Sequence, residues 1–84
     1  MKAKADLIEA WQANPHAEVD VIVHVDRPAA GHEKKLVDLG MHVGRVFRLT
    51  STISARGLAR DVLDLLQEPW VQKIELDAEV RTMT

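Results

Sequence analysis

The stretch that most constrains the fold is Val19–Val25, in which four valines alternate with Asp20, Ile22 and His24. Successive side chains of a strand point to opposite faces, so this pattern predicts a strand with one wholly apolar face and one mixed face. Valine and isoleucine are branched at Cβ, which favours strand over helix. We expect this strand to lie in the middle of its sheet.

The rest of the chain divides into alternating helical and extended segments. Apolar residues at helical spacing predict helices, and Asn14-Pro15, Gly40 and Glu68-Pro69 are signals that end them. The alternation of the second strand breaks between Val46 and Phe47, where we expect a bulge. The predicted helices are 3–13, 30–39 and 59–68, and the strands after the first are 41–50, 51–55 and 71–77.

This order, a helix followed by β-α-β-β-α-β, predicts an α+β fold of the ferredoxin-like type. It is an antiparallel sheet with helices on one face, plus an extra N-terminal helix. Right-handed crossovers place the first and third strands in the middle of the sheet. In the helix 30–39 we expect Leu36, Val37 and Leu39 to point inward. The other face of the sheet stays uncovered.

The length of 84 residues is enough for one domain with a single core. We divide it into an N-terminal helix and linker (1–17), a ferredoxin-like core (18–77) and an extended C-terminal tail (78–84). No segment reads as a signal peptide or approaches membrane-spanning length. We therefore expect a cytoplasmic protein, or a secreted one if the chain belongs to a longer precursor.

The sequence has no pattern typical of a catalytic or metal-binding site. There is no cysteine, and the four histidines lack the spacing of metal ligands. Ser51 and Ser54 lie in no nucleophile elbow. A net charge of −2 and a single Phe disagree with an RNA-binding sheet, which stacks bases on aromatic residues. We expect no enzyme activity, metal, cofactor, nucleic acid or membrane partner, and we place the function in protein binding.

The last strand separates apolar from charged residues. Ile74 and Leu76 point one way, towards the core. The charged residues point to the uncovered face, and they are Lys73, Glu75 and Asp77. The segment 78–84 that follows has neither Gly nor Pro. It is either a flexible chain end or a peptide that the domain presents to a partner.

Several groups of residues follow one another in a recognisable order: Val21–Val23, Leu39–Val43, Phe47–Ala55, and then Leu65, Pro69–Val71 and Ile74–Asp77. Together they resemble the propeptide domain of subtilisin-type serine proteases, a family that also contains free-standing inhibitors. The closest likeness is to the family's ending of leucine, proline-x-valine and isoleucine-glutamate-x-aspartate. The resemblance covers about Val19 to Met83, and the helix 3–13 is additional to the shortest members.

The resemblance implies that the chain binds a protease. In this family the open sheet face packs on two protease helices, and acidic residues cap the N-termini of those helices; by position these are Glu75 and Asp77. The tail enters the substrate groove as an added strand, and its residues are Val80, Arg81, Thr82, Met83 and Thr84. Counted from Asp77, Met83 takes the first specificity pocket and Val80 the pocket three residues upstream.

The resemblance thus predicts a monomeric inhibitor of a subtilisin-like serine protease, or a folding chaperone for one. The chain stops at Thr84, which favours an inhibitor that acts in trans. Another class of function stays open: a ferredoxin-like regulatory or dimerisation module that uses the open sheet face. That module would be a homodimer with a dispensable tail, favoured by exposure of Ile22 or Val46. A stable domain without a protease partner is the third possibility.

Overall fold

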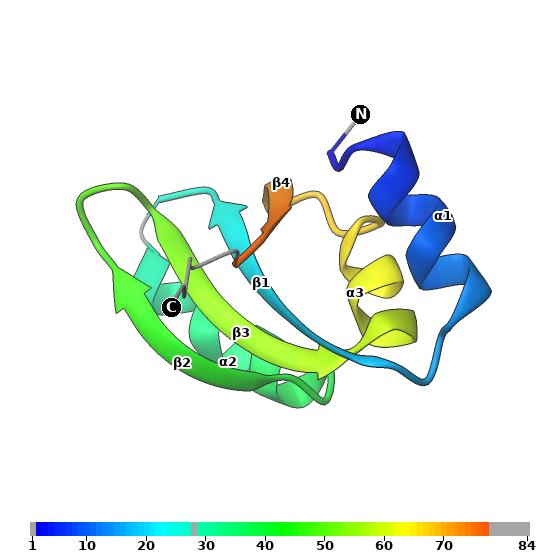
Figure 1. Ribbon diagram of the computed structural model, residues 1–84. Helices are drawn as coiled ribbons and strands as arrows, with labels where there is room; N and C mark the ends of the chain where they lie inside the picture. Colours follow the sequence, from blue (N-terminus) through cyan, green and yellow to red (C-terminus); the bar gives the residue numbers. More distant parts are fainter. Residues whose placement is uncertain (1, 28, 78–84) are drawn as a thin grey trace, which may run out of the picture.

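The computed structural model of the protein describes residues 2–27 and 29–77 (Figure 1). The elements follow the predicted order, which confirms the α+β class. They are α1 (Ala5–Ala13), β1 (Glu18–Val25), the 3-10 helix η1 (Ala29–His32), α2 (Glu33–Asp38), β2 (His42–Phe47), β3 (Thr52–Leu58), α3 (Ala59–Leu65) and β4 (Val71–Leu76).

The strands form one antiparallel sheet in the order β2-β3-β1-β4, so β1 and β3 are central as predicted. The β1–β3 register runs from Glu18↔Leu58 to His24↔Thr52. Figure 1 shows α2 behind β2 and β3, and α1 beside α3. The arrangement is consistent with a ferredoxin-like split β-α-β fold.

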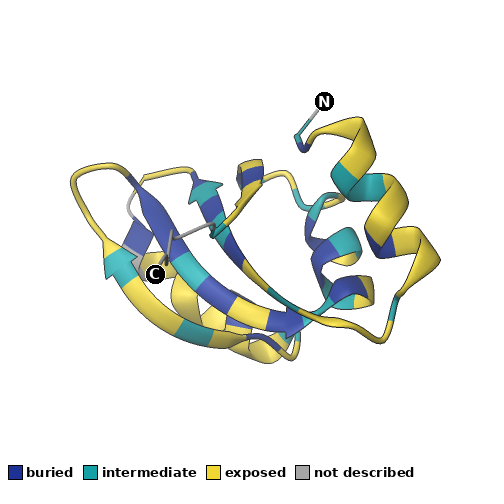
Figure 2. Cartoon of the chain, in the orientation of Figure 1, coloured by how far each residue is buried: buried dark blue, intermediate teal, exposed yellow. Residues whose placement is uncertain are grey.

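The core lies between the sheet and the helices. Val21, Val23 and Val25 of β1 are buried, as the alternation predicts. The helices contribute Leu36 from α2 and the buried residues of α3, and Figure 2 shows buried residues in α3 and along the two central strands. Burial of such side chains contributes about 1.5–3 kcal/mol each to folding, before entropy is counted. The fully buried large residues are Leu36, Ile53, Leu65, Ile74, Val21, Val23, Val25, Val62 and Val71.

The segment predicted as the helix 30–39 contains only a short α-helix after a 3-10 turn. Leu36 is buried and Leu39 half-buried, but Val37 is 56% exposed, so its inward prediction is wrong. Val37 lies about 100° around the helix from Leu36, and a helix this short buries only a narrow stripe. Gly40 ends the helix with φ +94°, the left-handed conformation predicted for it.

The irregularity of β2 lies at Gly44, between Val43 and Arg45, and not at Val46 and Phe47 as predicted. A Cβ at Gly44 would lie 2.9 Å from Ser54 Oγ, so a side chain does not fit there without displacing the serine. The same Oγ accepts the Arg45 N–H at 2.9 Å and replaces a ladder bond. Val46 consequently pairs with Ile53 and packs half-buried against the core; its expected exposure on the open face is wrong.

The end of β4 is less covered than the sequence suggests. Ile74 is buried, but Leu76 is 45% exposed although the alternation predicts it towards the core. Leu76 lies on an open hollow of about 740 Å³ that it shares with Leu7 and the N-terminal residues 2–4. No described helix fills this space. Leu76 therefore points to the same side of the sheet as Ile74 but is not buried.

Candidate functional site: the open face of the sheet

The face of the sheet opposite the helices carries rows of side chains that the strand register aligns. One row runs Glu75, Ile22, Ser54 and Arg45 from β4 to β2. The next runs Lys73, His24, Thr52 and Phe47. No helix among the described residues covers this face (Figure 1). This face therefore presents charged, polar and apolar groups at the surface of the molecule.

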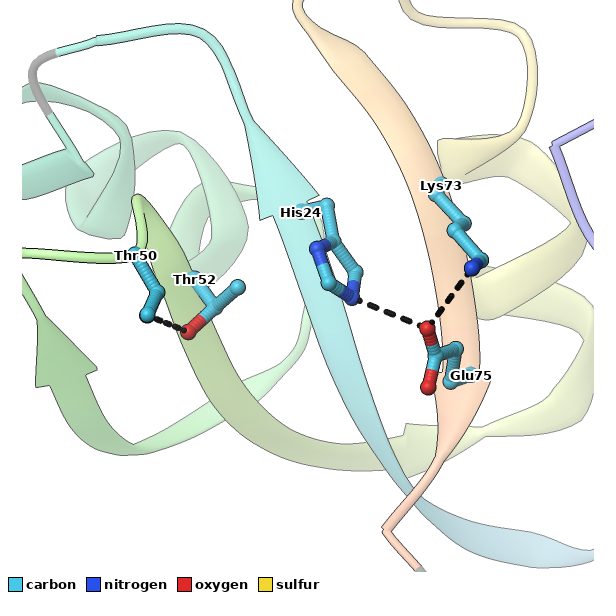
Figure 3. A network of polar contacts seen from close by, with 5 residues as sticks. All are labelled: His24, Thr50, Thr52, Lys73 and Glu75. Atoms are coloured by element: carbon cyan, nitrogen blue, oxygen red, sulfur yellow. Dashed lines mark hydrogen bonds and ion pairs between the residues drawn. The ribbon is translucent and has the colours of Figure 1, made fainter.

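Glu75 is a carboxylate of this face that contacts two basic side chains (Figure 3). Its Oε2 accepts the Lys73 ammonium at 3.0 Å and lies 3.2 Å from His24 Nε2. The hydrogen bond and charge of Lys73, with a smaller contribution from His24, lower the pKa of Glu75 below its usual 4.5. The carboxylate is thus a stable anion at neutral pH, and 47% of its side chain is open to solvent.

Asp77 follows the last residue of β4 and extends the pairing with β1, since its N–H donates to the Asp20 carbonyl at 3.0 Å. It is half-buried, and no ion pair joins it to another described residue. Asp77 lies at the margin of a shallow hollow of about 460 Å³ on the open face. The other residues of this hollow are Ile22, Gly44, Arg45, Phe47 and Ser54.

Two further contacts on this face cannot be predicted from the sequence. Arg56 of β3 binds the Asp20 carboxylate of β1, with Nε–Oδ1 at 2.6 Å. Near the β2–β3 turn, the hydroxyls of Thr50 and Thr52 share a hydrogen bond of 2.8 Å (Figure 3). Like the His24–Glu75 contact, the Arg56–Asp20 pair joins segments far apart in the chain. The only signal in the sequence is opposite charge, which does not identify partners without the register.

The structure brings together only part of the predicted site. Glu75 and Asp77 lie at the same end of β4 as predicted, next to the open face. The predicted groove residues Val80, Arg81, Thr82, Met83 and Thr84 lie outside the described residues. Within residues 2–27 and 29–77, three or more His, Asp or Glu side chains nowhere gather as metal ligands would. In the same residues, every helix is too short or too polar to span a membrane.

The arrangement as a whole fits recognition of another molecule by a surface. The face combines an ionised carboxylate, exposed arginines and a shallow, partly apolar hollow. Comparison with known proteins adds no relative: no family model matches this chain, and no curated protein matches it.

Proposed function

We propose that this chain is a protease-binding module that inhibits a subtilisin-like serine protease or assists its folding. The observation that carries the proposal is the position of Glu75 and Asp77 at the end of β4, beside an open sheet face and directly before the segment 78–84. The order of motifs in the sequence supports it, as does a fold with helices on one side of the sheet only.

The acidic pair would dock on helix N-termini of the protease. A helix N-terminus carries about half a positive charge and free N–H groups, and an anion there contributes about 0.3–1 kcal/mol. Glu75 suits this role because it is an exposed carboxylate that is ionised at neutral pH, with a pKa that Lys73 lowers further below its usual value. In the complex, N–H groups would replace or join Lys73 and His24. The exposed ion pair with Lys73 is worth little in water, so exchanging it costs little.

The segment after Asp77 would then enter the substrate groove. An extended peptide adds as a strand through main-chain hydrogen bonds, and pockets for particular side chains give specificity. In the proposed register Val80 and Met83 fill apolar pockets, while Arg81 and Thr82 line the groove. A tail anchored to a folded domain loses less entropy on binding than a free peptide, which slows its release and favours inhibition over cleavage.

The test is a titration of a subtilisin with this protein in the presence of a chromogenic peptide substrate. We expect inhibition at about micromolar concentration or below, and inhibition at least about tenfold weaker for a chain ending at Ala78. Absence of inhibition by the full chain well above micromolar concentration would refute the proposal for that protease. Equal inhibition by both chains would refute the role of the tail.

A matched pair of double variants tests the docking role of the carboxylates. Glu75→Gln with Asp77→Asn should weaken inhibition about three- to thirtyfold, because two helix-capping anions are lost. Glu33→Gln with Asp38→Asn makes the same charge change at exposed positions of α2 and should leave inhibition unchanged. The circular dichroism of all variants should stay the same. A loss of helical signal in the first variant would show that these carboxylates are structural.

A second candidate function, a regulatory or dimerisation module, is favoured by one observation. Ile22 and Phe47 line the hollow on the open face, and Phe47 is 39% exposed. Apolar residues in such a hollow suit a second copy of the chain. Sedimentation analysis distinguishes the two functions: a dimer that Phe47→Ser dissociates, together with no protease inhibition, would favour this candidate.

A further inference from the structure

The two edges of the sheet differ in how far other described residues cover them. On the outer edge of β4, the Ile74 N–H donates to the Lys2 carbonyl at 2.7 Å, and Lys2 Nζ in turn donates to the Glu68 carbonyl at 2.7 Å. The N-terminal residues thus cover part of that edge. On β2, no backbone hydrogen bond from the described residues reaches the outer edge. An uncovered edge is a template for another strand.

The register shows which residues carry the open hydrogen-bonding groups of β2. The Val25 N–H donates to the Ser51 carbonyl, so odd-numbered residues of β3 turn their backbone groups towards β1. Even-numbered residues of β3 therefore bond to their β2 partners, His42, Arg45 and Phe47. Val43 and Val46 are left with N–H and C=O groups that point outward. Their half-buried side chains lie on the helix side of the sheet.

The flank of this edge is basic. Between Leu39 and Arg60 the chain has three of its 11 lysines and arginines, Arg45, Arg48 and Arg56, and none of its 13 carboxylate side chains. Asp20 neutralises Arg56, but Arg45 and Arg48 are exposed and have no ion pair with a described residue. Arg45 and His42 project on the open face of β2. A strand added at this edge would meet positive charge on one side and valines on the other.

We propose that the β2 edge binds an extended segment of a partner protein in which acidic and apolar residues alternate. Its main chain would bond to Val43 and Val46. Acidic side chains would lie beside Arg45 and His42, and apolar ones beside the two valines, because directly neighbouring cross-strand pairs interact most strongly. A second copy of β2 is a poor occupant, since antiparallel pairing would bring Arg45, Arg48 and His42 of both copies together. The hydrogen-bonding edge of β2 is separate from Glu75, Asp77 and the tail, whereas Arg45 also lines the hollow on the open face.

The first test uses a blocked peptide of about nine residues in which valine and glutamate alternate. Titration into the ¹⁵N-labelled protein should shift the amide signals of β2 and slow hydrogen exchange at Val43 and Val46. Only alternate N–H groups of an added strand bond to the edge. N-methylation of the peptide at the residues whose N–H groups bond to the edge should therefore weaken binding at least about tenfold. N-methylation at the intervening residues should change the affinity less than about twofold.

The second test uses protein variants of equal charge. Arg45→Glu should weaken binding of the peptide at least about tenfold, whereas Arg60→Glu, an exposed position on α3, should change it less than about twofold. Three outcomes would overturn the proposal. These are equal effects of the two N-methylated sets, equal binding of a shuffled peptide or a single-stranded oligonucleotide, and a β2–β2 dimer of the free protein.

Discussion

Glu75 is held on the open face by two basic side chains. Lys73 lies two positions away on the same strand, so this ion pair forms within β4 alone. His24 comes from β1, so only the β1–β4 pairing brings it near. In the proposed complex a helix N-terminus competes with both groups for the same carboxylate. Because the ion pair with Lys73 is exposed and worth little in water, its displacement should cost the complex little.

Replacing Lys73 by alanine tests this balance. The pKa of Glu75 should rise towards 4.5 in Lys73→Ala, because its main hydrogen bond and nearest positive charge are lost. A lowered folded-state pKa stabilises the fold above the unfolded pKa, and this contribution is lost as pH falls through the folded pKa. The pair is exposed, so the loss of unfolding free energy near neutral pH should be at most about 0.5 kcal/mol and should vanish in acid.

The measurement is a ¹³C NMR titration of the carboxyl groups, combined with urea unfolding at neutral and acidic pH. Lys34→Ala, an exposed lysine of α2, is the control and should leave the pKa of Glu75 unchanged. An unaltered pKa in Lys73→Ala would mean that the ion pair does not persist in solution.

Among the elements, α1 is the one whose role the sequence leaves open. Trp11 is 3% exposed, and α1 packs against α3. The residues before α1 also reach the β4 edge through the Lys2 carbonyl. A helix of this length is marginal in isolation, so its stability comes from these contacts. α1 is therefore an integral part of the core and not a peripheral addition.

We expect Trp11→Ala to lower the unfolding free energy by about 3–5 kcal/mol, since it removes the buried anchor of α1 and leaves a cavity. Gln12→Ala, at an exposed position of the same helix, should change it by less than about 0.5 kcal/mol. Urea denaturation followed by far-UV circular dichroism measures both. Loss of only the α1 signal, with an unchanged main transition, would show that α1 unfolds independently.

For the molecule as a whole, the two faces of β1 differ in how far their side chains are buried. Val23 has no exposed surface and lies in the core, whereas its neighbour Ile22 is half-buried on the open face. The helices on one side supply the burial that stabilises the domain. No described helix covers the other side, and its apolar residues are partly exposed.

This division predicts unequal effects of two adjacent substitutions. Val23→Ala should lower the unfolding free energy by about 2 kcal/mol through lost burial and a cavity, and Ile22→Ala by less than about 1 kcal/mol. Chemical denaturation at several protein concentrations measures both. An equally large and concentration-dependent effect of Ile22→Ala would mean that a second copy covers the open face.

Much of the fold is predictable because the signals are local. Val19–Val25 marks a central strand, Gly40 ends a helix, and the order of elements with right-handed crossovers places β1 and β3 in the middle. The errors arise where local pattern competes with packing. Val37 fits a helical stripe that the short α2 does not bury, and the bulge lies at Gly44 because its missing side chain leaves room for Ser54.

The sequence by itself determined which residues could share a face, since alternation depends only on neighbours a few positions apart. Glu75 and Asp77 were placed on one side of β4 in this way. Only the tertiary structure decided what surrounds them: His24 beside Glu75, Asp20 paired with Arg56, and a β4 edge partly covered by the N-terminal residues, while no described residue bonds to the outer edge of β2. These contacts depend on register between distant segments, which the packing of the whole core selects.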